Sequence, residues 1–169
     1  MIEAIVLCGG KGSRVQHLHP GVPKVLYPVK NLVFLYFVLE ILFSQGCRKI
    51  ILAAGYKADQ IIEYIKGSKF ASFVTVSAEK EPLGTGGAVK HAQKHISSQN
   101  FLVLNGDSLT GVNFSELLFH NELHKAVGTI AVVAVDGRSD VGKIEMKDNS
   151  LIKSFNEKDG QGDYMSTGV

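Results

Sequence analysis

The sequence has little net charge and few cysteines. Its 18 Lys and Arg residues nearly balance its 16 Asp and Glu residues, leaving a formal net charge of +2 over 169 residues. This balance, without a basic stripe interleaved with aromatic residues, argues against nucleic acid as a partner. The two cysteines, Cys8 and Cys47, have no metal-ligand spacing. We therefore expect two reduced thiols in a cytoplasmic protein.

Long hydrophobic runs and targeting signals are also lacking. The longest apolar stretch, Leu32 to Phe43, is interrupted by Glu40 and is too short to span a bilayer. We expect it to form a buried helix, part of which could serve an interface between copies of the chain, and we expect no membrane partner. No basic segment followed by an apolar core opens the sequence, so no signal peptide is expected.

The sequence is rich in glycine, and its most informative glycine cluster comes early. An apolar run, Ala4 to Leu7, reads as a buried strand, and Cys8-Gly9-Gly10-Lys11-Gly12-Ser13-Arg14 follows it. Glycines let the backbone turn sharply and approach a ligand, and the N–H groups of such a turn can converge on an anion. Ser13 adds a hydroxyl donor and Arg14 a planar cation suited to phosphate.

A phosphate-binding loop is therefore one interpretation of this cluster, and a plain tight turn is the other. Two well-known nucleotide loops do not fit. In the P-loop a Ser or Thr follows the lysine, whereas Gly12 follows Lys11 here. In the dinucleotide fingerprint a third glycine stands where this chain has Val15.

Strands and helices alternate along the chain. Strands are predicted at 49–54, 73–77, 101–104 and 129–135, helices at 32–45, 57–66, 85–96 and 114–124, a strand pair at 141–146 and 151–155, and a polar remainder at 156–169. This order predicts an α/β fold with a mostly parallel sheet covered on both faces, and the fully apolar strand 101–104 is expected to be central. Such sheets bind ligands beyond the carboxyl ends of their strands.

The glycine loop after the first strand and the acidic turn after strand 101–104 both fall at that edge of the sheet. Asp107 directly follows strand 101–104, where it would cap local N–H groups or serve as an oxygen ligand for Mg²⁺. We favour the metal ligand, because a carboxylate at the end of a buried strand is unlikely to be a mere solvated charge. Lys24 follows Pro23 in a proline-stiffened loop and is either a surface residue or a phosphate contact.

Further motifs are weaker. A second glycine turn, Gly84-Thr85-Gly86-Gly87, begins a predicted helix. It is either a simple start of the helix capped by Thr85, or backbone that passes close to a nucleotide base. In the second case Glu79 would accept hydrogen bonds from that base. Glu157 and Lys158 end a later strand and are surface charges or contacts to a sugar hydroxyl and a phosphate. The pairs His91/His95 and His120/His124 have helical spacing but no third metal ligand.

Taken in order, these segments resemble the sugar-phosphate nucleotidyltransferase family. The family carries Gly-Gly-x-Gly-Thr-Arg-Leu, Pro-Lys, Pro-Leu-Gly-Thr-x-x-Ala, Gly-Asp and Glu-Lys. In this chain the corresponding segments are Gly9 to Val15, Pro23-Lys24, Pro82 to Ala88, Gly106-Asp107 and Glu157-Lys158. The similarity runs through the whole chain and is greatest to the branch that handles manno-heptose 1-phosphate or mannose 1-phosphate with GTP.

The resemblance implies a Rossmann-like, doubly wound nucleotidyltransferase domain over residues 1–169, with three α/β/α layers. It also implies transfer of a nucleotide from a nucleoside triphosphate to a sugar 1-phosphate. Arg14, Lys24 and Asp107 would be catalytic, with Asp107 holding Mg²⁺. The nucleotide would be bound by Leu7, Gly9, Gly10, Lys11, Gly12, Ser13, Arg14, Glu79 and Gly84, and the sugar phosphate by Gly142, Glu157, Lys158 and Gly168. Because a carboxylate only accepts hydrogen bonds and guanine offers two adjacent donors, Glu79 favours GTP.

The chain departs from the family pattern at three places. Ser13 replaces threonine but keeps the hydroxyl, and Asn31 and Val33 replace the Gly and Pro of a Gly-x-Pro. Residues 166–169 resemble a sugar-facing strand after which family members continue and supply a second metal-binding aspartate. We therefore expect a C-terminally incomplete domain or an incomplete metal site.

Three functions compete on this evidence. The first is an active nucleotidyltransferase, and the second is a non-catalytic module that binds a nucleotide or nucleotide-sugar. The third is a Rossmann-type oxidoreductase, which would need a ribose-binding acid where Ala53-Ala54-Gly55 stand.

Overall fold

A parallel four-stranded sheet forms the centre of the fold. The computed structural model describes residues 1–135, 141–147, 150–156 and 162–169. The strands β1 (Ile2–Cys8), β4 (Cys47–Ala54), β5 (Val74–Ala78) and β6 (Leu102–Asn105) lie in the order β5-β4-β1-β6. All three pairings are parallel, as the alternating pattern predicts. The middle of β1 and of β4 is fully buried, which explains their continuous apolar runs.

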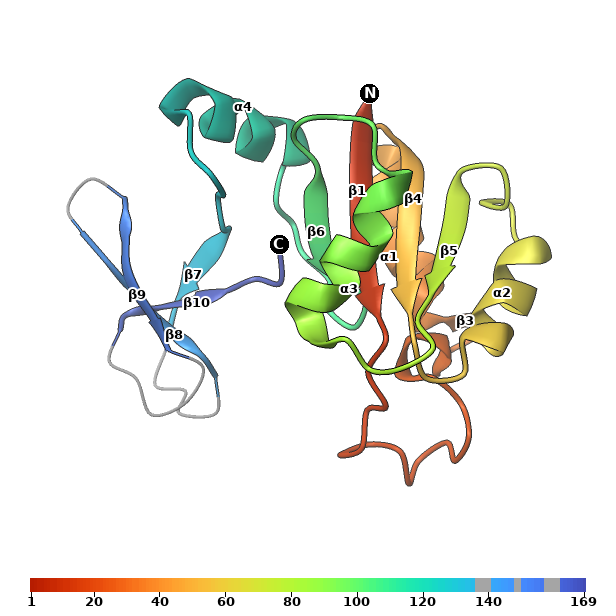
Figure 1. The fold of residues 1–169 in the computed structure, drawn as a ribbon. Helices are drawn as coiled ribbons and strands as arrows, with labels where there is room; N and C mark the ends of the chain where they lie inside the picture. Colours follow the sequence, from red (N-terminus) through yellow and green to blue (C-terminus); the bar gives the residue numbers. More distant parts are fainter. Residues whose placement is uncertain (136–140, 148–149, 157–161) are drawn as a thin grey trace.

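Helices cover both faces of this sheet and make three layers (Figure 1). The helices α1 (Phe34–Ser44) and α2 (Ala58–Lys66) pack on one face and bury a large core that includes Leu35, Leu39 and Ile61. The helix α3 (Gly84–Ala92) packs on the other face through Ala88 and Ala92. The helix α4 (Phe114–His124) anchors Phe114 in the larger core. The doubly wound arrangement expected from the sequence is thus confirmed.

A second, antiparallel sheet stands beside the first on the β6 side (Figure 1). It contains β7 (Val132–Ala134), β8 (Lys143–Met146), β9 (Ile152–Asn156) and β10 (Tyr164–Ser166) in the order β7-β10-β8-β9. The chain after β10 joins the two sheets, because the Asn105 amide donates to the Gly168 carbonyl at 2.9 Å and the Ala131 amide to the Val169 carbonyl at 3.0 Å.

The structure corrects the predicted position of one strand in the sheet and the predicted bounds of two helices. The strand β6 is at the edge of the parallel sheet rather than central; it is apolar because Leu102 and Leu104 are buried on one face in the larger core, while Val103 on the other face is half-buried. Residues 32–33 form β3 (Leu32–Val33), which pairs with β2 (Pro28–Val29), so the first helix begins at Phe34. The helix expected at 85–96 ends at Ala92 and continues as a 3₁₀ turn, Gln93–His95.

The C-terminal remainder is not merely polar loop, since it contains β10, and the strand expected at 129–135 is shortened to β7. Both cysteines are buried and free, in agreement with the expected thiols. Within the described residues, none of the helices combines the length and apolar character needed to cross a membrane.

Candidate functional site

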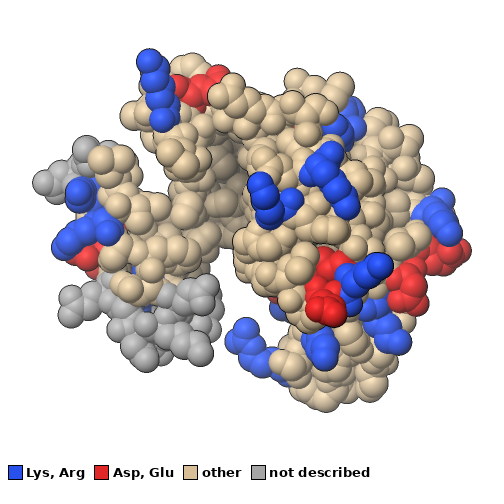
Figure 2. Space-filling model, in the orientation of Figure 1, with Lys and Arg blue, Asp and Glu red and all other residues tan. Residues whose placement is uncertain are grey.

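Two cavities meet at the carboxyl end of β6, and Figure 2 shows the molecule hollowed between the α/β body and the antiparallel sheet. The first, which we call the phosphate-loop cavity, has a volume of about 640 Å³ and is lined by Leu7, Cys8, Gly10, Gly12, Ser13, Arg14, Val15, Lys24, Val25, Thr85, Asn105 and Asp107. The second, the sheet-side cavity, has about 690 Å³ and is lined by Ser108–Gly111 and by residues of the antiparallel sheet that include Val133, Gly142, Phe155 and Met165. Asp107 and Ser108 are neighbours in the chain but line different cavities.

The glycine loop after β1 owes its shape to Gly12 and to a second glycine. Gly12 has φ +62°, and a Cβ there would lie 3.1 Å from the Cβ of Lys24. Gly55 backs the loop from the end of β4, because a Cβ on it would come within 3.1 Å of the Gly9 carbonyl oxygen. The next amide, Tyr56, donates to that oxygen at 3.2 Å. Glycines on two segments thus let Lys24 and the β4 end pack against the loop.

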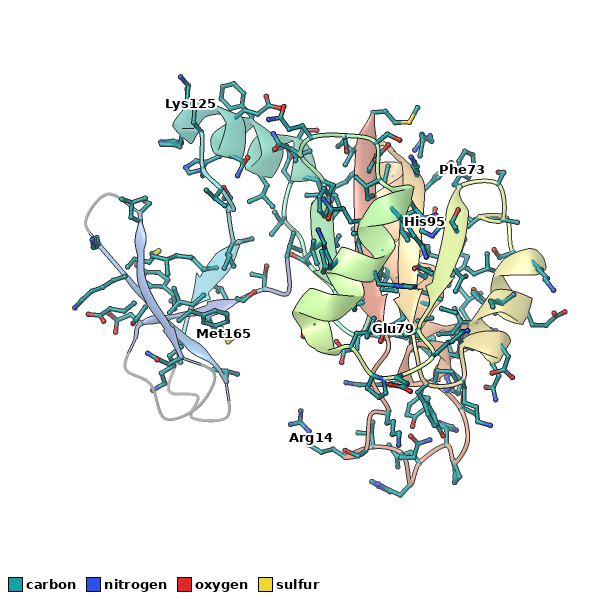
Figure 3. All side chains as sticks on the ribbon, in the orientation of Figure 1. Arg14, Phe73, Glu79, His95, Lys125 and Met165 are labelled. Carbon is teal, nitrogen blue, oxygen red and sulfur yellow. The ribbon has the colours of Figure 1, made fainter. Side chains whose placement is uncertain are left out.

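The two cations of the loop are open to solvent. Lys11 and Arg14 are both exposed. Figure 3 shows Arg14 extending from the loop toward the side of the molecule on which the antiparallel sheet lies. Such a cation is free to bind an anion that enters the phosphate-loop cavity.

Lys24 and Asp107 form an ion pair across this cavity. The Lys24 Nζ lies 2.8 Å from Asp107 Oδ2, although the residues are 83 positions apart. Lys24 begins the 3₁₀ turn η1 (Lys24–Leu26), which the buried Val25 anchors in the core. Asp107 follows Gly106, whose amide donates to the Leu7 carbonyl at 3.0 Å. The prediction that the acidic turn after β6 and the glycine loop share one edge of the sheet is confirmed.

Cys8 also lines the phosphate-loop cavity, but its thiol is unreactive. Burial raises its pKa to about 12, and the nearby negative charge of Asp107 adds to this effect. A protonated thiol is neither a nucleophile nor a metal ligand near neutral pH. The Cys8 Sγ packs against the backbone of Gly106, where a Cβ would lie only 2.8 Å from the sulfur.

Glu79, at the end of β5, holds an unsatisfied carboxylate oxygen. Its amide donates to the Ala54 carbonyl at 2.8 Å, and its Oε2 accepts from the Leu83 amide at 3.2 Å. Its Oε1 is buried without a hydrogen-bond partner among the described residues, and lies 3.6 Å from where a Cβ of Gly9 would be. A buried unpaired carboxylate oxygen is costly, so this atom is suited to receive a donor from a ligand.

The second glycine turn begins α3 directly. Gly84 is the first residue of the helix, has φ +69° and has open space where its Cβ would be. No side chain caps the helix, so the interpretation of Thr85 as its cap is wrong; Thr85 lines the phosphate-loop cavity instead. Glu79 lies near this end of α3 (Figure 3).

Of the four residues expected to bind the sugar phosphate, two lie within the described part of the chain. Gly142 lines the sheet-side cavity. Gly168 has φ +93°, and its Cβ would lie 3.3 Å from both the Asn105 Nδ2 and the Ser108 Cβ, at the junction of the two cavities. Glu157 and Lys158 lie outside the described residues.

The described residues contain no cluster of three or more His, Cys, Asp or Glu that could hold a metal ion. The His120 and His124 rings stack with centroids 4.2 Å apart, and the Nδ1 of His124 bonds to the His120 carbonyl. In the phosphate-loop cavity, Asp107 supplies the one carboxylate among these residues. A single carboxylate fits Mg²⁺ when substrate phosphates and water complete the coordination.

Sequence reasoning missed three residues of this region. Asn105 and Thr85 line the phosphate-loop cavity, and Gly55 supports Gly9. Asn105 stands two residues before Asp107 at the end of a buried strand, and this position could have indicated it. The contact of Gly55 with Gly9 depends on the pairing of β1 with β4, which no local pattern reveals.

Fold and site together define an α/β protein with a glycine loop, a cation and a carboxylate around a cavity suited to phosphates. The chain belongs to the nucleotidyl transferase family, whose model matches residues 3–169. This membership argues against the oxidoreductase alternative.

Similar proteins include the D-glycero-alpha-D-manno-heptose 1-phosphate guanylyltransferase of Campylobacter jejuni, 35% identical over 93% of this chain and 69% of its own length. The mannose-1-phosphate guanylyltransferase catalytic subunit beta of Drosophila melanogaster is 36% identical over 92% of this chain, which spans 43% of that protein. Among solved structures, HddC from Yersinia pseudotuberculosis complexed with GMP-PN matches with a TM-score of 0.83 and 31% identity, over 99% of this chain and 75% of that one.

Proposed function

We propose that this protein transfers a nucleoside monophosphate, preferably from GTP, to a sugar 1-phosphate of the manno-heptose or mannose type. The observation that carries the proposal is the phosphate-loop cavity, where Lys24 and Asp107 face each other at 2.8 Å beside the glycine loop. An oxygen of the sugar phosphate attacks the α-phosphorus, the bond from this phosphorus to the bridging oxygen breaks, and pyrophosphate leaves.

The chain's own residues contribute mainly position and charge. Arg14 and the N–H groups of residues 9–13 hold the β- and γ-phosphates, and Lys24 stabilises the charge that builds on the α-phosphate. Mg²⁺, when bound by Asp107 and the phosphates, offsets further negative charge. Gly142 and Gly168, which lie at the sheet-side cavity and at its junction with the phosphate-loop cavity, bind the sugar phosphate together with the charged pair Glu157 and Lys158.

The preference for guanine rests on Glu79. Guanine presents two adjacent donors, and Glu79 offers a buried Oε1 that lacks a partner among the described residues. The backbone at Gly84, at the start of α3 near Glu79, has open space where a side chain would be and can lie against a flat base. The names of the relatives, which are guanylyltransferases, support the same base.

Pyrophosphate release tests this function. The protein is incubated with Mg²⁺, each of four nucleoside triphosphates and a panel of sugar 1-phosphates that includes mannose and manno-heptose. We expect release with GTP and one manno-configured sugar, and Asp107→Asn should abolish it. Release with UTP and glucose 1-phosphate would overturn the assigned base and sugar.

A second candidate is a nucleotide- or nucleotide-sugar-binding module of the same fold. The observation that favours it is that Asp107 is the single carboxylate lining the phosphate-loop cavity among the described residues. Binding of GTP or a GDP-sugar without pyrophosphate release across the panel would support this candidate.

A further inference from the structure

The ion pair between Lys24 and Asp107 occupies two of the groups that the proposed function needs, the one for the α-phosphate and the one for the divalent cation. Each side chain is 40% exposed, and both line the same cavity. The other ion pairs among the described residues, such as Lys49–Glu3 and Lys69–Glu40, involve no residue that lines this cavity. The ligand-free protein thus neutralises its phosphate-binding cation with its metal-binding carboxylate.

The backbone holds both partners of the pair in place. Lys24 lies across Gly12, where a Cβ would come within 3.1, 3.5 and 3.6 Å of its Cβ, Cδ and Cγ. Val25 is buried, and the Gly106 amide is bonded to the Leu7 carbonyl. Because the attachment points are fixed, breaking the pair requires only that the two side-chain ends turn toward new partners.

Either ligand alone meets an unfavourable arrangement. A divalent cation finds the Asp107 carboxylate already bonded, with an ammonium group 2.8 Å away. A metal-free polyphosphate finds the Lys24 ammonium already paired with the Asp107 carboxylate. When both arrive, Asp107 pairs with the cation and Lys24 with a phosphate, so two attractions replace one.

We propose that the Lys24–Asp107 pair is a partner-exchange switch that makes nucleotide and divalent cation bind interdependently at this cavity. The inference rests on the proposed function for the identity of the ligands. Its tests measure binding in the absence of catalysis, so they can fail while the transferase activity stands.

The first test measures Mn²⁺ binding without nucleotide, from the electron paramagnetic resonance signal of free Mn²⁺. Lys24→Met should bind Mn²⁺ roughly fivefold more tightly than wild type, the scale expected for losing a partly exposed ion pair. Lys24→Arg, which keeps the pair, and Lys11→Met, which removes an exposed cation of the glycine loop, should both stay within about twofold of wild type. Equal tightening by Lys11→Met would show a mere net-charge effect and overturn the proposal.

The second test measures GTP binding by calorimetry with excess EDTA, in a double-mutant cycle. Asp107→Asn should tighten metal-free GTP binding roughly fivefold where Lys24 is present, because the freed ammonium can turn to the phosphates. In the Lys24→Met background the same substitution should change affinity by less than about twofold. Equal tightening in both backgrounds would mean direct repulsion by Asp107 and would also overturn the switch.

The proposed function and the switch fail in different ways. Wild type that does not bind GTP even with Mg²⁺ contradicts the function and the nucleotide half of the switch. Tight Mg²⁺-dependent GTP binding, with no effect of Lys24→Met on Mn²⁺, contradicts the switch alone. Circular dichroism of every variant checks that it is folded, and Lys24→Gln, which also removes the ammonium, replaces Lys24→Met in both tests if Lys24→Met does not fold.

Discussion

At the level of single residues, Glu79 and Gly12 are the positions where a substitution tests the proposed base selection and the backbone path of the glycine loop. Glu79 holds its Oε2 on the Leu83 amide while its Oε1 is buried and unpaired among the described residues. If guanine donates to this carboxylate, Glu79→Gln replaces a charge-assisted acceptor by an amide and should lower the ratio of kcat/KM for GTP over UTP roughly tenfold.

The exposed Glu81, two residues further along, provides the matched control for this prediction. Glu81→Gln should leave the GTP to UTP ratio unchanged, because it removes the same charge from the same loop without touching Oε1. A Glu79→Gln enzyme with wild-type selectivity would show that the base is recognised elsewhere.

Gly12 is the residue at which the loop is least tolerant of a side chain. Alanine there adopts φ +62° unfavourably and places its Cβ 3.1 Å from that of Lys24, so Gly12→Ala should lower the free energy of unfolding by about 1–2 kcal/mol. Gly10 has open space where its Cβ would be. Urea unfolding of the ligand-free proteins measures the stability of Gly12→Ala and of Gly10→Ala, and the Gly12 variant should be the less stable. Equal stabilities of the two variants would refute this view of the loop.

Between elements, the clearest link opposite the site joins β1 to the segment after α3. Glu3 is 6% exposed and accepts hydrogen bonds from the amides of Ser97 and Ser98 and from Lys49. Burial by itself would raise the pKa of Glu3, but these hydrogen bonds outweigh it and lower the pKa from 4.5 to about 2. The carboxylate therefore stabilises the fold in its charged form.

This link makes stability depend on pH. Because the folded pKa is below the unfolded one, Glu3 stabilises the protein above about pH 4.5, and this contribution is lost as pH falls toward 2. At pH 7, Glu3→Gln should lower the free energy of unfolding by about 3 kcal/mol, and by much less near pH 3. Urea unfolding at both pH values measures this, with the exposed Glu122→Gln as control. An equal loss of unfolding free energy in Glu3→Gln at pH 7 and pH 3 would contradict the low pKa of Glu3.

Elements with strong local patterns could be predicted, and those made by distant pairing could not. The sequence predicted α4 at its observed bounds, and continuous apolar runs located β1 and β4 to within a few residues. It missed β10, a short strand whose partners β7 and β8 lie far along the chain. It also placed β6 in the middle of the sheet, since a short apolar run looks the same in an edge strand as in a central one.

At the scale of the whole molecule, the site lies where two sheets meet. Motif order identified the segments, and the parallel sheet brings residues 83 positions apart to a 2.8 Å contact. No sequence motif predicted that Lys24 and Asp107 bond to each other. Nor did any motif predict that Glu79 leaves one carboxylate oxygen unpaired among the described residues. Those facts arise from packing of loops that local sequence does not connect.

The fate of the α-phosphorus distinguishes nucleotidyl transfer from other reactions of GTP. GTP labelled at the α-phosphorus is incubated with the protein, Mg²⁺ and the manno-configured sugar 1-phosphate that gives release, or with each in turn. The α-label should appear in a nucleotide-sugar, label in the γ-position should appear in pyrophosphate, and Asp107→Asn should stop both. Release of the γ-label as inorganic phosphate, or an α-label that stays in GTP for every sugar while GTP binds, would contradict nucleotidyl transfer by this protein.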